Sequence, residues 1–245
     1  MNQTTQVLTD YTSAIIEPFR QYEQIEDGAL IRPHSLAEDG SRLLDAIAVQ
    51  TPEAGMPYWR VRTWGLLLWQ PLYIAVLCVH QVKAVPNTLN QLVQRQQGNF
   101  TLGYRLPDHT IWQTYTTPQA AVEAVALQLN VLVEHYAQSL EQQTFARRPL
   151  LNALFADQII TTLERFAPTL APEKSSQWLY QEGKRWCDAI GVSLPKNAEW
   201  LLQDDSPYQR KSCCLVFRCN NSVECANCPR LNKSKTHKKK GLTHG

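Results

Sequence analysis

Cysteine is concentrated in one short segment near the C-terminal end of the chain. Five of the seven cysteines lie between residues 213 and 228, and two of them, Cys213 and Cys214, are adjacent. Cys225 and Cys228 follow, with two residues between them. Free cysteine packs as a small hydrophobe, but its reactivity usually explains where it occurs. The segment therefore predicts a disulfide, a zinc site or an iron–sulfur cluster, and any fold has to bring these thiols together.

The spacing separates these three chemistries only in part. Disulfides are rare in the cytosol, and residues 1–17 lack the basic and apolar regions of a secretory signal. Zinc sites commonly pair two C-x2-C turns. Cys225 and Cys228 form one such pair, but Cys213 and Cys214 have no spacer, and neighbouring side chains of an extended chain point apart unless the backbone turns. Four cysteines also hold [2Fe–2S] clusters. Spacing alone leaves zinc and iron–sulfur equally open.

A longer pattern around these cysteines resembles a known family. It consists of Arg210-Lys211-Ser212-Cys213-Cys214-Leu215 and, after ten residues counted from Cys214, Cys225-Ala226-Asn227-Cys228-Pro229. This is similar to the C-terminal signature of the FhuF-like ferric siderophore reductases. The resemblance implies a [2Fe–2S] cluster with Cys213, Cys214, Cys225 and Cys228 as its ligands. Cys219 has no counterpart in the family pattern. Two roles stay open for it: an alternative ligand and a structural thiol.

The resemblance also implies an activity. The expected enzyme is a siderophore-iron reductase that transfers one electron from the cluster to Fe(III) in a hydroxamate-type siderophore and releases Fe(II) in the cytoplasm for iron assimilation. Hard oxygen ligands hold Fe(II) less tightly than Fe(III), so one electron loosens the metal. The electron donor would be a ferredoxin or an NAD(P)H-dependent reductase. Two alternatives stay open: a zinc-stabilised helical binding module, and an iron–sulfur electron carrier or sensor without a siderophore site.

Charge and hydropathy restrict the partners. Six basic residues and no acidic residue follow Cys228, so the part of the chain before them carries a net charge of −4 against +2 for the whole. A mildly acidic body is not the pattern of a nucleic-acid-binding domain. The apolar run from Trp64 to Val79 contains Pro71 and is shorter than the roughly 20 residues that span a bilayer. We expect no transmembrane segment, although peripheral association with the inner membrane is compatible with this.

Other cofactor and substrate sites are not evident in the sequence. With 10 glycines and no Gly-rich phosphate loop, a Rossmann-type flavin or nicotinamide site is not expected. Residues that bind the substrate are therefore unknown. Aromatic and cationic side chains suit an oxygen-rich ferric chelate, but each candidate equally suits a core or an ordinary surface. The candidates by chemistry alone are Trp59, Arg60, Arg62, Trp64, Trp178, Lys184, Arg185 and Trp186.

Hydrophobic periodicity predicts an α+β fold, predominantly α-helical, with a small antiparallel β-hairpin and a C-terminal iron–sulfur segment. The expected domains are a helical domain over residues 1–205, a cluster-binding segment over 206–230 and a basic, disordered tail over 231–245. Helices are expected over 8–26, 40–50, 58–82 (as two helices meeting near Gln70), 117–142, 147–168, 173–190 and 197–202. The loop between the second and third is expected over 51–57, and the hairpin over 98–116, with its turn at 107–109.

Overall fold

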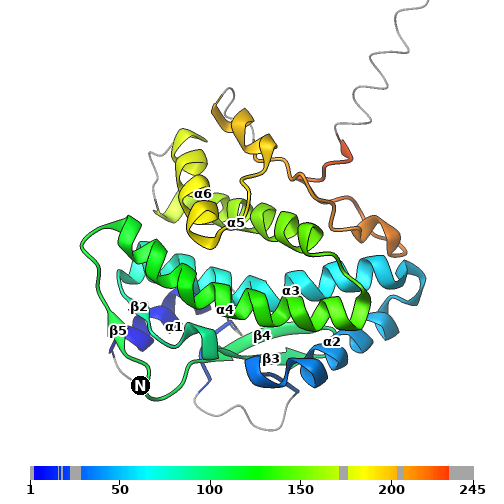
Figure 1. The fold of residues 1–245 in the computed structure, drawn as a ribbon, viewed down its shortest axis with the longest axis horizontal. Helices are drawn as coiled ribbons and strands as arrows, with labels where there is room; N and C mark the ends of the chain where they lie inside the picture. The colour runs from blue at the N-terminus through cyan, green and yellow to red at the C-terminus, as the bar shows by residue number, and fades with distance from the viewer. Residues whose placement is uncertain are drawn as a thin grey trace, which may run out of the picture.

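Helices and a small sheet form three layers in this computed structural model (Figure 1). The structure describes residues 3–15, 17, 19–22, 29–170, 176–202 and 207–231. The sheet and helix α2 (Leu36–Gln50) lie on one side, α3 (Gly55–Leu77) and α4 (Pro118–Thr144) cross the middle, and α5 (Arg148–Leu170) and α6 (Ser176–Ile190) lie on the other side. This confirms the predominantly helical α+β fold. Of the predicted tail, only Leu231 is among the described residues.

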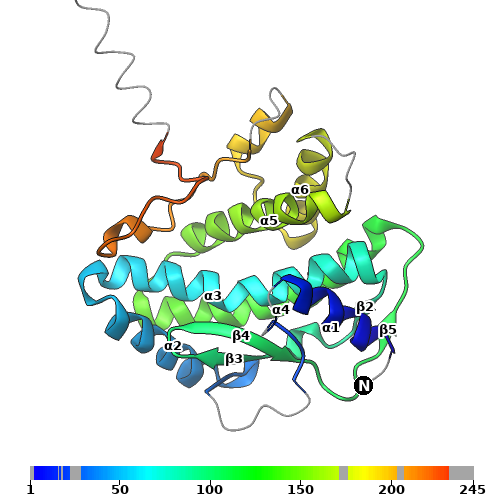
Figure 2. The same cartoon turned by 180° about the vertical axis from the view of Figure 1, so that it is seen from behind.

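The strands are short and antiparallel. β1 (Leu30–Ile31), β3 (Val93–Gln97) and β4 (Phe100–Arg105) form one sheet in the order β1-β3-β4, and β2 (Val85–Pro86) pairs with β5 (Trp112–Gln113). Figure 2 shows α1 (Gln3–Ile15) on the side of the molecule where the sheet lies. Short turns of 3-10 or π type complete the fold: η1 (Pro33–Ser35), η2 (Pro52–Ala54), η3 (Cys78–Val82), η4 (Leu89–Gln91), η5 (Lys196–Leu202) and η6 (Val216–Arg218).

Helix α3 is the central element, and it packs against α2, α4, α5 and β4. Pro71 lies inside it without breaking it, so the prediction of two helices meeting near Gln70 is wrong. A proline frees the carbonyl four residues earlier, here that of Leu67. The Gln94 side chain on β3 donates to this carbonyl at 2.7 Å, and the Gln70 side chain donates to Gln94 at 2.9 Å. A tertiary contact thus supplies the hydrogen bond that the proline removes.

Because α3 is continuous, the apolar helical stretch is longer than the run from Trp64 to Val79 considered in the sequence. The stretch Pro52–Val82 is long and apolar enough to cross a membrane by length and composition alone. However, 67% of its most apolar window is buried inside the fold. The chain uses this stretch as its core helix.

The first strand of the expected hairpin, β4, pairs with a different strand from the one expected. β4 appears where the alternation predicted it, but it pairs with β3 through a turn at Gly98, whose φ is 57°. The predicted turn after it also forms, because the Thr110 N–H donates to the Pro107 carbonyl at 3.1 Å. Beyond that turn, Trp112–Gln113 pairs with β2 instead. Alternation identifies strands but does not say which strands pair.

The N-terminal boundaries differ from the predicted ones. The helix expected over 8–26 spans Gln3–Ile15, and Gln21 forms an isolated bridge with Tyr104 instead. Pro18 disfavours a helical conformation in the residue before it. Residues 23–28 lie outside the described part of the chain. Val49, expected on the inner face of α2, is exposed. The loop expected over 51–57 is shorter, since α3 already begins at Gly55 and a helix tolerates proline in its first turn.

The C-terminal helices follow the predictions more closely. The Thr117 hydroxyl accepts the N–H of Ala120 at 3.2 Å, which is the predicted N-cap of α4. Gly191, with φ of 81°, follows the end of α6 as a left-handed cap. Pro168 lies inside α5 rather than closing it. The short helix expected over 197–202 is a 3-10 turn, η5.

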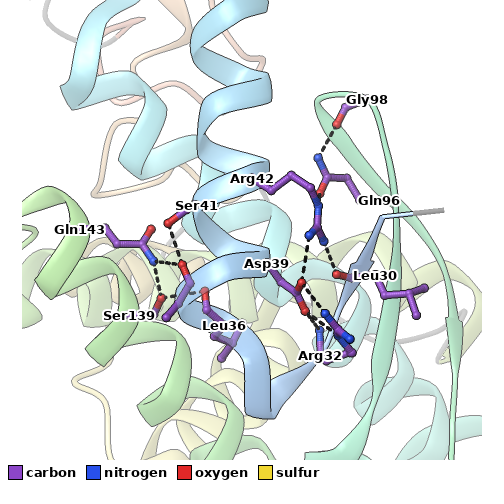
Figure 3. Close-up of polar contacts among 11 residues, drawn as sticks. Leu30, Arg32, Leu36, Asp39, Ser41, Arg42, Gln96, Gly98, Ser139 and Gln143 are labelled. Atoms are coloured by element: carbon purple, nitrogen blue, oxygen red, sulfur yellow. Dashed lines mark hydrogen bonds and ion pairs between the residues drawn. The ribbon is translucent and has the colours of Figure 1, made fainter. Parts of the chain in front are cut away.

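A buried carboxylate fixes α2 to the sheet (Figure 3). Asp39 accepts the backbone N–H of Arg32 at 2.9 Å and its guanidinium Nε at 3.0 Å, and Arg42 Nη1 lies 3.0 Å from Asp39 Oδ1. Arg42 also donates to the Leu30 carbonyl and to Gln96. Burial alone would raise the pKa of Asp39, but hydrogen bonds from Arg32 and Arg42 hold it below its usual value. This cluster has a structural role.

Candidate metal centre

The cysteine segment, residues 207–231, runs past α5 and reaches the beginning of α3 before it turns back (Figure 1). Its outermost part is the turn η6, which contacts both η2 and α3. The segment contains no regular helix or strand of its own apart from this turn. Its position must therefore be fixed by contacts with the helical layers.

Asp157 on α5 holds the residues just before the first cysteine. Its buried side chain accepts the Tyr208 hydroxyl at 2.5 Å and the backbone N–H of Lys211 at 2.8 Å, and it also accepts the N–H of Ser212. Hydrogen bonds to a carboxylate are stronger than those between neutral groups. Burial raises the pKa of Tyr208, and the neighbouring Asp157 raises it further. Glu164, two turns along α5, accepts the Tyr208 N–H at 2.6 Å.

A second anchor lies at the beginning of α3. Arg218 Nε donates to the Ala54 carbonyl at 2.6 Å, and the Asn220 N–H donates to Glu53 at 2.8 Å. The hydrogen bond from Asn220 lowers the pKa of Glu53. The residues between the two anchors include Cys213 and Cys214, so both thiols are carried on backbone that is held at each end.

The backbone turns immediately after the adjacent cysteines. Leu215 has φ of 60°, in the left-handed region that non-glycine residues seldom adopt, and η6 begins at the next residue. The Leu215 N–H points back to Cys213 Sγ at 3.4 Å. This is the turn that two neighbouring cysteines need if both are to contribute to one site.

The second pair of cysteines is folded against the first. The Cys228 N–H donates to the Cys225 carbonyl at 3.0 Å, and Gln209 donates to the Cys228 carbonyl at 2.9 Å. Cys214 Sγ and Cys225 Sγ lie 3.1 Å apart. Among the described residues, no three His, Cys, Asp or Glu side chains converge as ligands of a single metal ion. The closest approach is this one pair of thiols.

Neighbouring thiols add to the effect of burial on the pKa of two of these cysteines. Burial raises the pKa of Cys213, and the thiols of Cys214 and Cys228 raise it further. Burial and the hydrogen bond with Cys214 raise the pKa of Cys225 to about 11. Thiols that oppose one another's ionisation bind as thiolates once a metal cation compensates their charge. The donor set therefore fits an iron centre with several thiolate ligands.

The other cysteines have different surroundings. Cys219 hydrogen-bonds Tyr58, and burial followed by this bond raises the pKa of Tyr58 to about 12. Cys78 and Cys187 are buried in the helical core, and burial raises the pKa of each thiol, to about 12 for Cys187. A buried thiol of high pKa is unreactive. These two cysteines are packing residues.

A cavity of about 590 Å³ opens beside the cysteines, between α3, β4 and α5, and is partly open to solvent. Cys214 and Cys225 are among the residues that line it. Its aromatic lining residues are Tyr58, Trp64, Trp69, Tyr73 and Phe100, and its basic lining residues are Arg62, Arg165 and Arg210. The volume is within the range of pockets that hold drug-sized molecules.

A comparison with family sequence models identifies the segment. Residues 210–230 match the family described as FhuF 2Fe-2S C-terminal domain. This segment of the chain is similar to a FhuF-type 2Fe–2S domain. The match spans the cysteine segment and decides between the zinc and iron–sulfur chemistries that spacing left open. No solved structure matches the chain.

Only two of the eight predicted substrate candidates line the cavity beside the cysteine segment. Arg62 and Trp64 line the cavity. Trp59, which donates to the Thr51 carbonyl at 2.9 Å, and Arg60 lie on α3 but do not line the cavity. The remaining candidates, Trp178, Lys184, Arg185 and Trp186, lie on α6 and do not line it either.

Several residues of the site were missed by sequence reasoning. Asp157 lies at helical spacing between Leu154 and Ile160, which are both buried. A charged residue on an apolar helix face was therefore the sequence signal that could have identified it. No local sequence pattern marks Arg165 and Tyr73 as cavity residues, because they come together only through the packing of α3 against α5. The cavity itself is a product of tertiary structure.

Proposed function

We propose that this protein is a ferric siderophore reductase in which Cys213, Cys214, Cys225 and Cys228 hold the [2Fe–2S] cluster. The observation that carries the proposal is the cavity of about 590 Å³, because Cys214 and Cys225 are among its lining residues. A bulky chelate in this cavity lies next to the thiolate ligands. The contact between Cys214 Sγ and Cys225 Sγ and the backbone turn at Leu215 support the ligand assignment.

When bound by the cysteines that line the cavity, the [2Fe–2S] group would supply single electrons there. The chain's own residues bind and orient the chelate. Aromatic side chains of α3 and β4 present flat, largely apolar walls, and arginines offer planar hydrogen-bond donors for oxygen-rich ligands. In the proposed reaction, chelated Fe(III) gains one electron and becomes Fe(II). Hard oxygens hold Fe(II) less tightly, so the metal leaves and the chelator survives.

A ferredoxin or an NAD(P)H-dependent reductase is the proposed electron donor, and the cytoplasm is the proposed location. The donor proposal is supported by the lack of a Gly-rich dinucleotide motif in the sequence. The proposed location is supported by the use of the most apolar helix, α3, as the core of the fold.

Reoxidation of the reduced holoprotein tests this function. Anaerobically reduced protein is mixed with a ferric trihydroxamate and a ferrous trap, and the visible spectrum of the cluster and the formation of trapped Fe(II) are followed together. We expect both signals to appear at the same rate, with one Fe(II) per electron lost. A cluster that stays reduced in the presence of ferric chelates would contradict the proposal and favour an electron carrier or sensor.

A further inference from the structure

Arg210, just before the first pair of cysteines, is tied by its backbone to the second pair. Its N–H donates at 3.1 Å to the carbonyl of Asn227, in the turn of that second pair. Its carbonyl accepts the side-chain amide of Asn197, on η5, at 3.4 Å. Cys214, Cys225 and Arg210 all line the same cavity. The fold therefore fixes this arginine beside a proposed ligand from each pair.

The guanidinium of Arg210 has an N–H group without an acceptor. Arg210 Nε is buried and has no hydrogen-bond partner among the residues that the structure describes. In the same part of the chain, no ion pair joins Arg210 to a carboxylate. Buried polar groups are almost always hydrogen-bonded, so an unpaired one calls for an explanation. Because Nε is shielded from solvent, its acceptor belongs to the interior of the cysteine site and not to the open space of the cavity.

The charge of Arg210 acts on the neighbouring thiol of Cys225. Burial and the hydrogen bond with Cys214 raise the pKa of Cys225, whereas the positive charge of Arg210 opposes this rise. A neutral thiol is only a weak hydrogen-bond acceptor. A [2Fe–2S] group held by these cysteines brings thiolates and sulfides, which are anionic acceptors and form stronger hydrogen bonds with a guanidinium. The bound group would supply the acceptor that Nε lacks.

From this geometry we infer that Arg210 sets the reduction potential of the cluster, because its Nε–H group donates to a cluster sulfur on the side of Cys225. Hydrogen bonds to the sulfurs and the net charge of the site control the potential of an iron–sulfur centre. Reduction adds negative charge, so the guanidinium stabilises the reduced form more than the oxidised form and raises the potential. The inference rests on the ligand assignment of the proposed function and adds a residue other than a cysteine to it.

The direction of this effect suits the proposed electron donor. Four-cysteine clusters of the plant ferredoxin type have low potentials. A second four-cysteine cluster accepts an electron from such a donor favourably only if its own potential is higher. The hydrogen bond and the charge from Arg210 would supply this difference, so that one electron passes from the donor into the cluster.

Three substitutions at Arg210 separate the charge from the hydrogen bond. Arg210→Gln removes the charge but keeps an amide at about the position of Nε, because the glutamine amide nitrogen and arginine Nε are both bonded to Cδ. Arg210→Lys keeps the charge but replaces Nε with a methylene group. Arg210→Met removes both. The reduction potential of each holoprotein is measured by anaerobic redox titration, followed in the visible spectrum.

We expect Arg210→Met to lower the equilibrium constant for one-electron reduction by about tenfold or more, which corresponds to about 59 mV. Arg210→Gln and Arg210→Lys should fall between this variant and the unmodified protein. Lys211→Gln is the matched control, since it removes an adjacent charge whose side chain is exposed. Water and salt screen an exposed charge, so the control should stay within about twofold. An unchanged potential in the Arg210 variants, or an equal change in the control, would overturn the inference.

The hydrogen bond is also observable in the unmodified holoprotein. Its arginines are isotopically labelled at Nε, the cluster is reduced, and pulsed electron paramagnetic resonance measures the coupling between the unpaired electron and nearby labelled nitrogen. We expect a coupling that is lost in Arg210→Lys and kept in Arg230→Lys, which alters an arginine that is half-exposed and paired with Glu224. No coupling in the unmodified protein, or its loss in Arg230→Lys, would contradict the inference.

The inference and the proposed function fail in different ways. If the Arg210 variants lower the potential but no ferric chelate reoxidises the reduced cluster, Arg210 has the inferred role and the reductase proposal is wrong. If ferric chelates reoxidise the cluster and its potential does not depend on Arg210, the reductase proposal stands and the inference about Arg210 is wrong.

Discussion

Single residues decide where the cysteine segment sits, and the most important of them is not a cysteine. Asp157 joins α5 to Tyr208, Lys211 and Ser212 through one buried carboxylate. The sequence predicted the thiols because cysteine clustering is a local pattern. It could not predict this anchor, because the partners of Asp157 lie about fifty residues further along the chain.

Asp157→Asn is expected to loosen the segment. The amide keeps the shape but replaces one accepting oxygen with a donor, which leaves a backbone N–H without its partner. An unsatisfied buried donor costs about 1–3 kcal/mol. We expect less iron per chain after purification and a lower melting temperature. Asp188→Asn on α6, where the carboxylate is exposed in an i,i+4 pair with Lys184, is the control and should change neither.

Cys219 is expected to be dispensable for the cluster, because its thiol bonds Tyr58 whereas Cys214 lies 3.1 Å from Cys225. Cys219→Ser should therefore keep the visible spectrum and the iron content of the unmodified protein, and Cys214→Ser should lose both. Both variants replace one sulfur with oxygen in the same short segment, so each controls for the other. Loss of the cluster in Cys219→Ser would mean that the ligand assignment is wrong.

At the level of elements, tertiary contacts overrule local preference. Pro71 is a strong signal for a helix break, and it misled the prediction because Gln94, on a strand of the sheet, supplies the missing hydrogen bond. The N-cap at Thr117 and the cap at Gly191 were predictable, because a cap acts within one turn of its own helix. The pairing of β4 with β3 was not predictable from alternation alone.

Gln94→Leu is expected to destabilise the protein by about 2 kcal/mol or more, because the Leu67 carbonyl and the Gln70 side chain lose a buried partner. Urea unfolding of the variant measures this. Gln97→Leu on the same strand is the control, since Gln97 is exposed and a surface change is worth about 0.5 kcal/mol or less. Equal stability of the two variants would show that α3 does not depend on this contact.

At the scale of the whole molecule, the layers place the cysteine segment next to a cavity that α3, β4 and α5 form together. Helical content and the position of the metal centre were predictable from periodicity and cysteine spacing. The cavity was not, since Trp69, Phe100 and Arg165 lie far apart in the sequence and meet only through packing.

The basic C-terminal residues give a prediction at this scale. If Lys238–Lys240 steer an acidic ferredoxin to the cluster, removal of residues 232–245 should slow cluster reduction at low ionic strength and leave it unchanged at high ionic strength, because salt screens the attraction. The truncation keeps Leu231, whose N–H donates to the Cys228 carbonyl at 3.2 Å. Stopped-flow reduction measures both rates. Equal rates at low ionic strength would contradict the steering.

The most direct test of the account is the metal and sulfide content of protein purified without oxygen. We predict iron and acid-labile sulfide in equal amounts, in the proportion of a [2Fe–2S] centre to each chain, and a loss of both in Cys228→Ser. One zinc ion and no labile sulfide, or an unchanged iron content in Cys228→Ser, would contradict the claim that these cysteines hold a binuclear iron centre beside the cavity.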